Sequence, residues 1–363
     1  MFYLFLCCTC FCILSDWLAW LKIRKEKTKT LPKMPFVSIL VAARNEEANI
    51  LACLHSLAKL SYPHVEILIG DDNSTDNTLN IVQNFIKDKP QFAVIQVKEK
   101  IGTAIAKANV LAQLARKAKG EWLFVTDADV QVPSDWIENM LTEGEKSEII
   151  IGFTWVKGKG LFAVLQALDW TFALATAKMF SYFGLPLTAM GNNMAVRRAT
   201  YLQTGGYENM PPTLVEDFML FKKIAIEGRK PFYQAFSHRV MAETKAIDNF
   251  GRFLQQRKRW MQGALQTHWI AQTYLWLRVG FYPLFLLTIL MQVASRQSIF
   301  VLFAIKLFWQ SVALHKFLKI IGKTKFIWAF GLYEMYLAFL SIILPIYYLI
   351  PLKIRWKDRI FEV

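Results

Sequence analysis

Cysteine is scarce in this chain of 363 residues, and its placement excludes several classes of protein. Four of the five cysteines lie between Cys7 and Cys12, inside one apolar stretch, and Cys53 stands alone. No spacing among them is typical of a zinc site, and no set of pairs fits a disulfide framework. The sequence therefore argues against a small fold held together by disulfides or by structural zinc.

Acidic residues are also few, 28 against 43 lysines and arginines, which leaves a net charge of +15. A basic balance can indicate nucleic acid as a partner, but the sequence contains no recognisable nucleic-acid-binding module. The basic residues instead flank apolar segments, a pattern typical of proteins that face anionic lipid headgroups. They include Lys22, Arg24, Lys25, Lys27 and Lys29 after the first apolar segment, and Lys319, Lys323 and Lys325 before the last. We expect membrane lipids, and no nucleic acid, among the partners.

Hydrophobic residues make up 54% of the chain and concentrate at its two ends. Residues 2–21 form an apolar run long enough to span a membrane as a helix, without the basic start and cleavage site of a signal peptide. Three later blocks are also long enough: 275–293, 299–318 and 326–352. We therefore predict an integral, multi-pass membrane protein. Its predicted parts are an N-terminal transmembrane helix (1–24), a linker (25–35), a catalytic domain (36–270) and a C-terminal membrane domain of about three spans (271–363).

The basic cluster after the first span places the catalytic domain in the cytoplasm by the positive-inside tendency. Three C-terminal spans would then leave a basic tail on the opposite side: Lys353, Arg355, Lys357 and Arg359. Either the last block turns back near its prolines, or one block lies at the membrane surface. We also predict interfacial helices at about 159–187 and 250–270, with a buried core helix as the alternative for the first.

Between the apolar ends, short strands alternate with helices. Apolar strands are predicted at 36–42, 65–70, 92–97 and 122–126, and helices at 48–60, 77–87 and 105–118. Continuous apolar strands in this alternation predict an α/β fold with a mostly parallel sheet, covered by helices on both faces. In such a sheet the ligand lies beyond the carboxyl ends of the strands.

Acidic pairs follow two of these strands directly: Asp71 and Asp72, then Asp127 and Asp129. Carboxylates gathered at one edge of a sheet repel one another unless a cation lies between them. Oxygen ligands suit Mg²⁺ or Mn²⁺, which commonly bind through one or two carboxylates and substrate phosphates. The pairs thus predict a site for a metal and a diphosphate, with turn formation as the alternative for each pair taken alone.

Three later features are further candidates. Lys107 lies near the start of a helix and could reach donor phosphates, although a solvated helix residue would look the same. Glu216 and Asp217 begin an amphipathic helix, where the helix dipole favours acids; the functional interpretation makes Asp217 a general base. The basic and aromatic segment 255–260 could anchor the chain at headgroups. It could equally hold a diphosphate through Arg259 and stack Trp260 on a sugar.

Together and in this order, these motifs resemble the membrane-bound family 2 glycosyltransferases, which include cellulose and hyaluronan synthases and have a similar set in ceramide glucosyltransferases. The resemblance covers residues 36 to about 265. The matching segments are Val37-Ser38-Ile39, Ala42-Ala43-Arg44-Asn45-Glu46, Asp71-Asp72-Asn73-Ser74-Thr75-Asp76, Thr126-Asp127-Ala128-Asp129, Gly191-Asn192-Asn193, Glu216-Asp217 and Gln256-Arg257-Lys258-Arg259-Trp260.

The resemblance implies a GT-A fold, a Rossmann-like nucleotide-sugar-binding domain, and a role for each matching residue. Ala42, Glu46 and Asp72, supported by Asp71, would line the base and ribose pocket; Lys107 and Asp127 would contact the diphosphate side of the donor. Asp129, with Asp127, would bind Mg²⁺ or Mn²⁺. Gly191, Asn192, Asn193 and Glu216 would face the acceptor, and Asp217 would be the catalytic base. Gln256, Arg259 and Trp260 would hold the diphosphate and the acceptor. Two departures are Val215, where the family often has a small or hydroxyl residue, and a missing glycine near Lys107.

The expected function is an inverting, metal-dependent transfer of a hexose from a nucleotide sugar, with uracil as the family's usual base. A lipid acceptor comes first, because few spans are available to form a polymer channel. A short processive polysaccharide synthase is the alternative acting on a glycan. A catalytically silent scaffold and a transporter with Lys306, His315 and Glu334 in its spans are the alternatives from other classes. The sequence indicates no protein partner.

Overall fold

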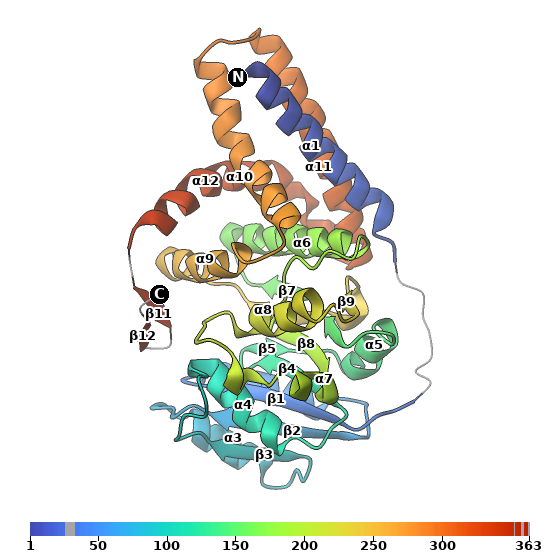
Figure 1. Cartoon of the computed structure of the whole chain (residues 1–363), viewed down its shortest axis with the longest axis vertical. Helices are drawn as coiled ribbons and strands as arrows, with labels where there is room; N and C mark the ends of the chain where they lie inside the picture. Colours follow the sequence, from blue (N-terminus) through green and yellow to red (C-terminus); the bar gives the residue numbers. More distant parts are fainter. Residues whose placement is uncertain (26–32, 352, 357–358, 362–363) are drawn as a thin grey trace.

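The computed structural model describes residues 1–25, 33–351, 353–356 and 359–361. Most of the predicted linker, with Lys27 and Lys29, lies outside these described residues, as does Lys357 of the tail. Figure 1 shows an α/β domain on which a group of long helices stands, with the N-terminus at the far end of that group.

The α/β domain is built on a seven-stranded sheet with the strand order β3-β2-β1-β4-β8-β6-β9. Strands β1 to β4 run parallel to one another, and β8 runs antiparallel to both β4 and β6. The strands are β1 (Val37–Ala43), β2 (Val65–Asp71), β3 (Phe92–Gln96), β4 (Trp122–Asp127), β6 (Ile149–Ile151), β8 (Asn193–Arg197) and β9 (Phe232–Gln234). The mostly parallel sheet confirms the predicted fold class, and each of the four predicted strands is present within one residue at either end.

Helices cover both faces of the sheet because its central strands are apolar on both sides. In β1, Leu40 packs into one core with Val110 and Leu114 of α4, whereas Ile39 and Val41 pack into the other with Leu54 of α2. The helices of this domain are α2 (Ile50–Ala58), α3 (Thr78–Ile86), α4 (Ala106–Lys117), α5 (Trp136–Glu143), α7 (Arg198–Gln203) and α8 (Glu216–Phe221), which continues as the π-helical η2 (Lys222–Glu227). Short 3₁₀ turns are η1 (Tyr207–Asn209) and η3 (His238–Val240).

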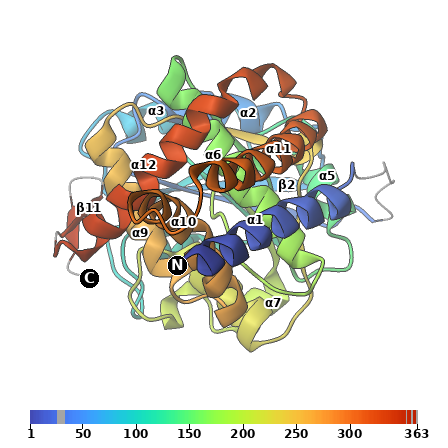
Figure 2. The same cartoon turned by 90° about the horizontal axis from the view of Figure 1, so that it is seen from above.

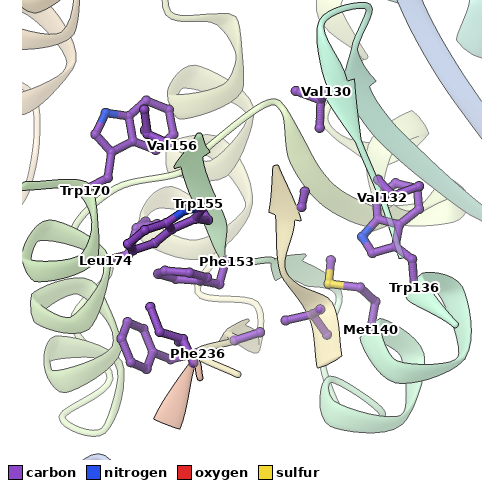
Figure 3. Packing of buried hydrophobic residues seen from close by; sticks show 14 of the residues in the cluster. Val130, Val132, Trp136, Met140, Phe153, Trp155, Val156, Trp170, Leu174 and Phe236 are labelled. Atoms are coloured by element: carbon purple, nitrogen blue, oxygen red, sulfur yellow. The ribbon is translucent and has the colours of Figure 1, made fainter. Parts of the chain in front are cut away.

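A second, three-stranded sheet with the order β5-β10-β7 lies between the large sheet and the long helices. Its strands are β5 (Val130–Gln131), β7 (Thr154–Lys157) and β10 (Ala242–Lys245). The helix α6 (Leu161–Ser181) packs on β7, and Figure 3 shows Trp155 of β7 beside Trp170 and Leu174 of α6. Within the region predicted at about 159–187, Leu161–Ser181 form one continuous helix through Asp169 and Lys178, and the chain leaves the helix before Leu187.

Four helices of the described chain are long and apolar enough to span a membrane. They are α1 (Phe2–Lys22), α10 (Trp269–Leu290), α11 (Arg296–Ile320) and the 3₁₀ turn η4 (Thr324–Ala329) joined to α12 (Phe330–Leu349). Ion pairs join them, Asp16 to Arg278 at 2.6 Å and Lys306 to Glu334 at 2.7 Å. Lys306 and Glu334 thus pair with one another between α11 and α12.

Helix α12 runs across the base of the α1, α10 and α11 group rather than alongside it, and it contacts α6 and α9 (Phe250–Ala264) (Figures 1 and 2). Beyond α12, the strands β11 (Ile354–Trp356) and β12 (Arg359–Phe361) form a hairpin beside α9. The basic tail therefore lies next to the α/β domain. Of the two arrangements that the sequence left open, this position favours a last block that lies at the membrane surface.

Candidate active site

The strand ends bring the predicted acidic residues together. In the register of the sheet, Ala43 of β1 pairs with Asp71, and Ala42 pairs with Asp127 on the other side. Cys53 lies close to the same edge, because its thiol contacts the carbonyl of Asp127 at 3.6 Å. Burial raises the pKa of this thiol, and the negative charges of Asp129, Asp127 and Glu46 raise it further. Glu46 after β1, Asp127 at the end of β4 and Asp129 in the β4–β5 turn therefore all lie near Cys53 at this edge of the sheet.

Lys107 links this acidic edge to α8. Its Nζ lies 2.5 Å from Oδ1 of Asp127 and 3.2 Å from Oε1 of Glu216, and its side chain is 15% exposed. Burial alone would lower the pKa of Lys107, but the charges of Asp127, Glu216 and Asp217 outweigh burial and raise it. Lys107 therefore stays protonated. Burial also raises the pKa of the Glu216 carboxyl, although the positive charge of Lys107 acts in the opposite direction.

The backbone that delivers Lys107 is strained. Ala106, at the start of α4, has a φ of 49°, in the left-handed region that glycine adopts without a steric penalty. A non-glycine residue there costs on the order of 1 kcal/mol or more. The glycine that the sequence lacks near Lys107 is thus missing where the backbone favours one, and the buried ion pairs of Lys107 hold the conformation in place.

Asp217 is held by two backbone N–H groups. Gly191 donates to Oδ2 at 2.6 Å, and Phe218 donates to Oδ1 at 2.8 Å. A Cβ atom at Gly191 would lie 2.7 Å from Cβ of Asp217 and 2.9 Å from its Oδ2, so only glycine fits there. The predicted base is half-buried, with a fixed orientation at the start of α8.

Asn193 and Glu216, which were predicted to face the acceptor, are buried inside the protein. Asn193 is 0% exposed, accepts a hydrogen bond from Trp136 at 3.0 Å, and donates to the carbonyls of Phe153 and Val240. Its amide is therefore fully used inside the core and does not reach a substrate. Glu216 is also buried and pairs with Lys107, so it positions the lysine and does not face an acceptor.

Asn192 is buried as well, and its side-chain oxygen accepts a hydrogen bond from Thr154 at 3.0 Å. Its carbonyl accepts from Thr126 at 3.0 Å, which ties the segment before β8 to the end of β4. Asn192 therefore fixes the loop that carries Gly191. Gly191 is the member of this predicted group that reaches the candidate base.

Helix α9 carries the predicted Gln256, Arg259 and Trp260 on one face, because residues three and four apart lie on the same side of a helix. Nε of Arg259 is buried without a hydrogen-bond partner among the described residues. The charge of Arg259 is one of the influences that lower the pKa of Glu216, so the arginine lies near the acidic cluster. An unpaired buried guanidinium N–H is a donor suited to a phosphate oxygen.

The remaining residues of this segment fix α9 in place. Arg257 pairs with Asp169 of α6 at 2.6 Å and stacks on Trp260, which itself packs edge-on against Trp170 at 5.1 Å. Asp169 interrupts the apolar pattern of α6 because it holds this arginine.

Helix α12 holds α9 from the other side. Gln255 donates to the hydroxyl of Tyr347 at 2.8 Å, and Lys258 donates to the carbonyl of Ile350 at 2.5 Å. The contacts that anchor α9 thus come from Gln255, Arg257 and Lys258, which lie next to the predicted site residues in the sequence.

The donor end contains one residue that the sequence analysis missed. Arg359 of β12 makes a bidentate pair with Asp72, at 2.7 and 3.2 Å. Nearby, Oδ1 of Asp71 is buried and has no hydrogen-bond partner among the described residues. The sequence did contain one indication of Arg359, because it belongs to the basic tail whose side of the membrane did not fit the positive-inside tendency. An unpaired carboxylate oxygen beside Ala42 and Glu46 is an acceptor suited to an N–H or O–H group of a ligand.

The donor set at the β4–β5 turn fits a hard divalent cation. Asp127 and Asp129 are both half-buried at the end of β4, and carboxylate oxygens are the ligands that Mg²⁺ and Mn²⁺ prefer. Within the described part of the chain no three such side chains form a closed metal cage. This composition suits an ion that takes its other ligands from substrate and water.

Comparison with known proteins agrees with this geometry. The family model described as glycosyl transferase family 21 matches residues 1–363. A beta-monoglucosyldiacylglycerol synthase of Nostoc sp. is 29% identical over 248 residues, which cover 65% of this chain and 50% of that protein. A poly-beta-1,6-N-acetyl-D-glucosamine synthase of Staphylococcus epidermidis is 23% identical over 237 residues, 62% of this chain and 54% of that protein. The chain thus matches about half the length of these curated relatives.

Among solved structures, a mannosyltransferase from Pyrobaculum calidifontis in complex with GDP-Man and Mn²⁺ superposes with a TM-score of 0.60. The alignment covers 92% of this chain and 97% of the mannosyltransferase, at 17% sequence identity. At this identity the likeness shows the fold, which is the GT-A type that the resemblance implied.

Proposed function

Because the chain belongs to glycosyl transferase family 21, we propose that it transfers a sugar from a nucleotide-sugar donor to a lipid or glycan acceptor at a membrane surface. The membership and the glycosyltransferase relatives confirm the predicted resemblance to the family 2 group. The observation that carries the proposal is the convergence of Asp127, Lys107, Glu216 and Asp217 at the carboxyl edge of the sheet.

The donor end of this site would bind the nucleotide. Asp71 offers an unpaired buried oxygen beside Asp72, Ala42 and Glu46, which suits the hydrogen-bond donors of a base or ribose. A uracil nucleotide is the donor we propose, on the family resemblance. Lys107 and Arg259 would face the diphosphate and stabilise the negative charge that develops as the nucleotide leaves.

Asp127 and Asp129 would hold Mg²⁺ or Mn²⁺ in this scheme. When bound, the cation would neutralise part of the diphosphate charge and so make the nucleotide a better leaving group. The half-buried carboxylates of Asp127 and Asp129 at the end of β4 support this assignment.

Asp217 would act as the general base. Its two N–H contacts fix the carboxylate while leaving further lone pairs to accept the proton of an attacking hydroxyl. A single displacement at the anomeric carbon inverts that carbon, so an α-linked donor would give a β-linked product. Proton couplings at the anomeric position of the product test this step, and a retained configuration would refute it.

A membrane lipid is the acceptor we favour. The helices α6, α9 and α12 lie between the α/β domain and the long helices (Figure 1), and Trp260 of α9 packs against Trp170 of α6. The similarity to a synthase named for monoglucosyldiacylglycerol supports this choice. The similarity to a poly-N-acetylglucosamine synthase supports a short polysaccharide as the alternative product.

The decisive experiment supplies membranes containing the protein with a panel of labelled nucleotide sugars and either Mg²⁺ or Mn²⁺. Wild type should transfer one sugar, and Asp217→Asn should lose the transfer by roughly a hundredfold or more. Asp88→Asn, an exposed acid on the turn before β3, is the matched control and should keep full activity. A single labelled lipid supports the first acceptor and a ladder supports the alternative. Equal transfer by wild type, Asp217→Asn and membranes without the protein would favour the silent scaffold.

A further inference from the structure

A groove of about 470 Å³ lies outside the site described above, where the end of α1 meets α11. It is lined by Trp20 of α1, by Ile327 of η4 and by residues of α11 between Ser311 and Lys319. Helices α1 and α11 lie side by side, and this end of the pair is the one next to the α/β domain (Figure 1). The groove therefore lies at the level where the long helices meet the domain.

One wall of the groove carries a basic stripe. Ser311, His315 and Lys319 follow one another at intervals of four along α11, so they share one face of the helix. His315 and Lys319 are exposed, and their side chains make no hydrogen bond or ion pair within the part of the chain that the structure describes. This face therefore presents the Lys319 ammonium and the His315 ring to its surroundings.

The adjoining Lys316 is fixed in position. Its Nζ donates to the carbonyl of Trp20 and lies 4.9 Å from the centre of the Trp20 ring. The lysine is therefore half-buried between the two helices, where its side chain lines the groove beside Trp20. Trp20, Val312 and Ile327 supply an apolar surface beside it.

A basic rim on an apolar groove at the end of a span matches an anionic lipid. Tryptophan and lysine gather at the headgroup level of membrane proteins, and basic pockets between spans bind anionic headgroups. A soluble anion would gain nothing from the apolar lining, whereas the glycerol and upper acyl chain of a lipid would cover it. We propose that this groove binds one anionic phospholipid, with its phosphate at Lys316 and Lys319 and its apolar part against Trp20.

Lipid retention by the purified full chain tests the proposal. Protein extracted from vesicles of phosphatidylcholine mixed with phosphatidylglycerol is passed through size exclusion, and the retained lipids are measured by mass spectrometry. Wild type should be enriched in phosphatidylglycerol. Each lysine near an anionic surface contributes roughly a fivefold preference, so Lys316→Gln/Lys319→Gln should lose most of the enrichment. Lys319→Gln alone leaves the contact of Lys316 with Trp20 intact and should lose about fivefold.

The matched control is Lys22→Gln/Lys25→Gln, which removes the same charge from exposed positions at the end of α1 outside the groove lining. It should retain wild-type enrichment, and Lys316→Arg/Lys319→Arg should do the same. Equal enrichment in wild type and Lys316→Gln/Lys319→Gln would overturn the proposal. So would an equal loss in the control, because diffuse surface charge would then explain the binding.

Discussion

Lys107 shows, at the scale of one residue, how a buried cation organises an acidic site. Its two carboxylate partners come from the end of β4 and the start of α8, which are 89 positions apart in the chain (216 − 127). Because the pKa of Lys107 is raised, its ion pairs are complete below the ordinary lysine value of 10.5. They would be lost only as the pH rises through the raised pKa, so they do not respond to changes near neutrality.

Replacing Lys107 should unbalance this cluster. Lys107→Met leaves the buried Glu216 carboxylate without its partner, which should destabilise the fold by about 3–5 kcal/mol. The midpoint of thermal unfolding in detergent measures the loss. The double variant Lys107→Met/Glu216→Gln removes both charges and should recover much of the stability while remaining inactive. Full recovery of transfer in the double variant would contradict the role proposed for Lys107.

Gly191→Ala should damage the candidate base and little else. Its Cβ would meet Cβ of Asp217 at 2.7 Å, so the carboxylate must shift. A misplaced catalytic group of this kind costs roughly a hundredfold in rate. Gly280→Ala is the matched control, since a Cβ there has open space and should leave the rate unchanged. Transfer rates of the two purified variants settle the comparison, and a Gly191→Ala enzyme at full rate would show that Asp217 tolerates the displacement.

At the scale of elements, α9 is held on two sides so that a third can face the site. Arg257 binds α6, while Gln255 and Lys258 bind the end of α12. Gln256 and Arg259 remain for the proposed site, whereas Trp260 also packs against Trp170 of α6. The sequence showed which residues share a face of this helix, but not which neighbouring element each face would meet.

The hairpin after α12 should depend on a single pair. Asp72→Asn or Arg359→Gln alone should release the tail and speed its cleavage by chymotrypsin roughly fivefold, the equivalent of ~1 kcal/mol for a partly exposed pair. The double variant should be cleaved no faster than either single variant, because both changes remove the same interaction. Lys33→Gln, which breaks an exposed pair with Glu121 elsewhere, should leave tail cleavage unchanged. Additive effects of the two changes would mean that the pair does not hold the hairpin.

Glu243 of β10 ties the small sheet to the turn after α11. Partial burial would raise the pKa of Glu243, but Lys157 and Lys323, at 3.0 and 3.4 Å, outweigh it and lower the pKa. The stabilisation is therefore present above the ordinary value of 4.5 and is lost as the pH falls through the lowered value. Unfolding midpoints measured across the acid range should fall less steeply for Glu243→Gln than for wild type. Parallel curves would show that the pair contributes nothing to the acid sensitivity.

At the scale of the molecule, one hydrophobic core joins the sheet to the long helices. The same cluster contains Ile39 of β1, Trp155 of β7, Leu174 of α6, Phe317 of α11 and Tyr336 of α12. A continuous core of this kind fixes the α/β domain relative to the helices that carry it. The site would then keep a constant height above the membrane surface, which suits an acceptor that arrives within the bilayer.

The path of the helices predicts the topology. Because α12 lies across the base of the group (Figure 1), we predict that α1, α10 and α11 cross the membrane and that tags on the two ends of the chain lie on opposite sides of it. An epitope tag placed before Met1 and one placed after Val363 should be exposed in vesicles of opposite orientation. Lys119→Cys places a cysteine on the exposed surface of the α/β domain, and it should be labelled in the same vesicles that expose the C-terminal tag. Two tags exposed on the same side would mean that α12 spans the membrane.

The sequence by itself determined the elements and the chemical character of the site. Apolar runs that end in Asp71 and Asp127 predicted parallel strands whose carboxyl ends meet. This was possible because the burial of a strand and the position of its end depend on residues close together in the chain. The same local patterns located the long apolar helices and the segment that became α9. The order of these motifs was enough to identify the family.

Only the tertiary structure decided which distant residues meet. It paired Lys107 with Glu216, withdrew Asn193 into the core, and returned Arg359 to Asp72 across most of the chain. No local pattern contains this information, since such contacts depend on which helix and strand faces pack together. A buried amide or carboxylate has the same sequence signature as one that faces a substrate, and only packing distinguishes the two.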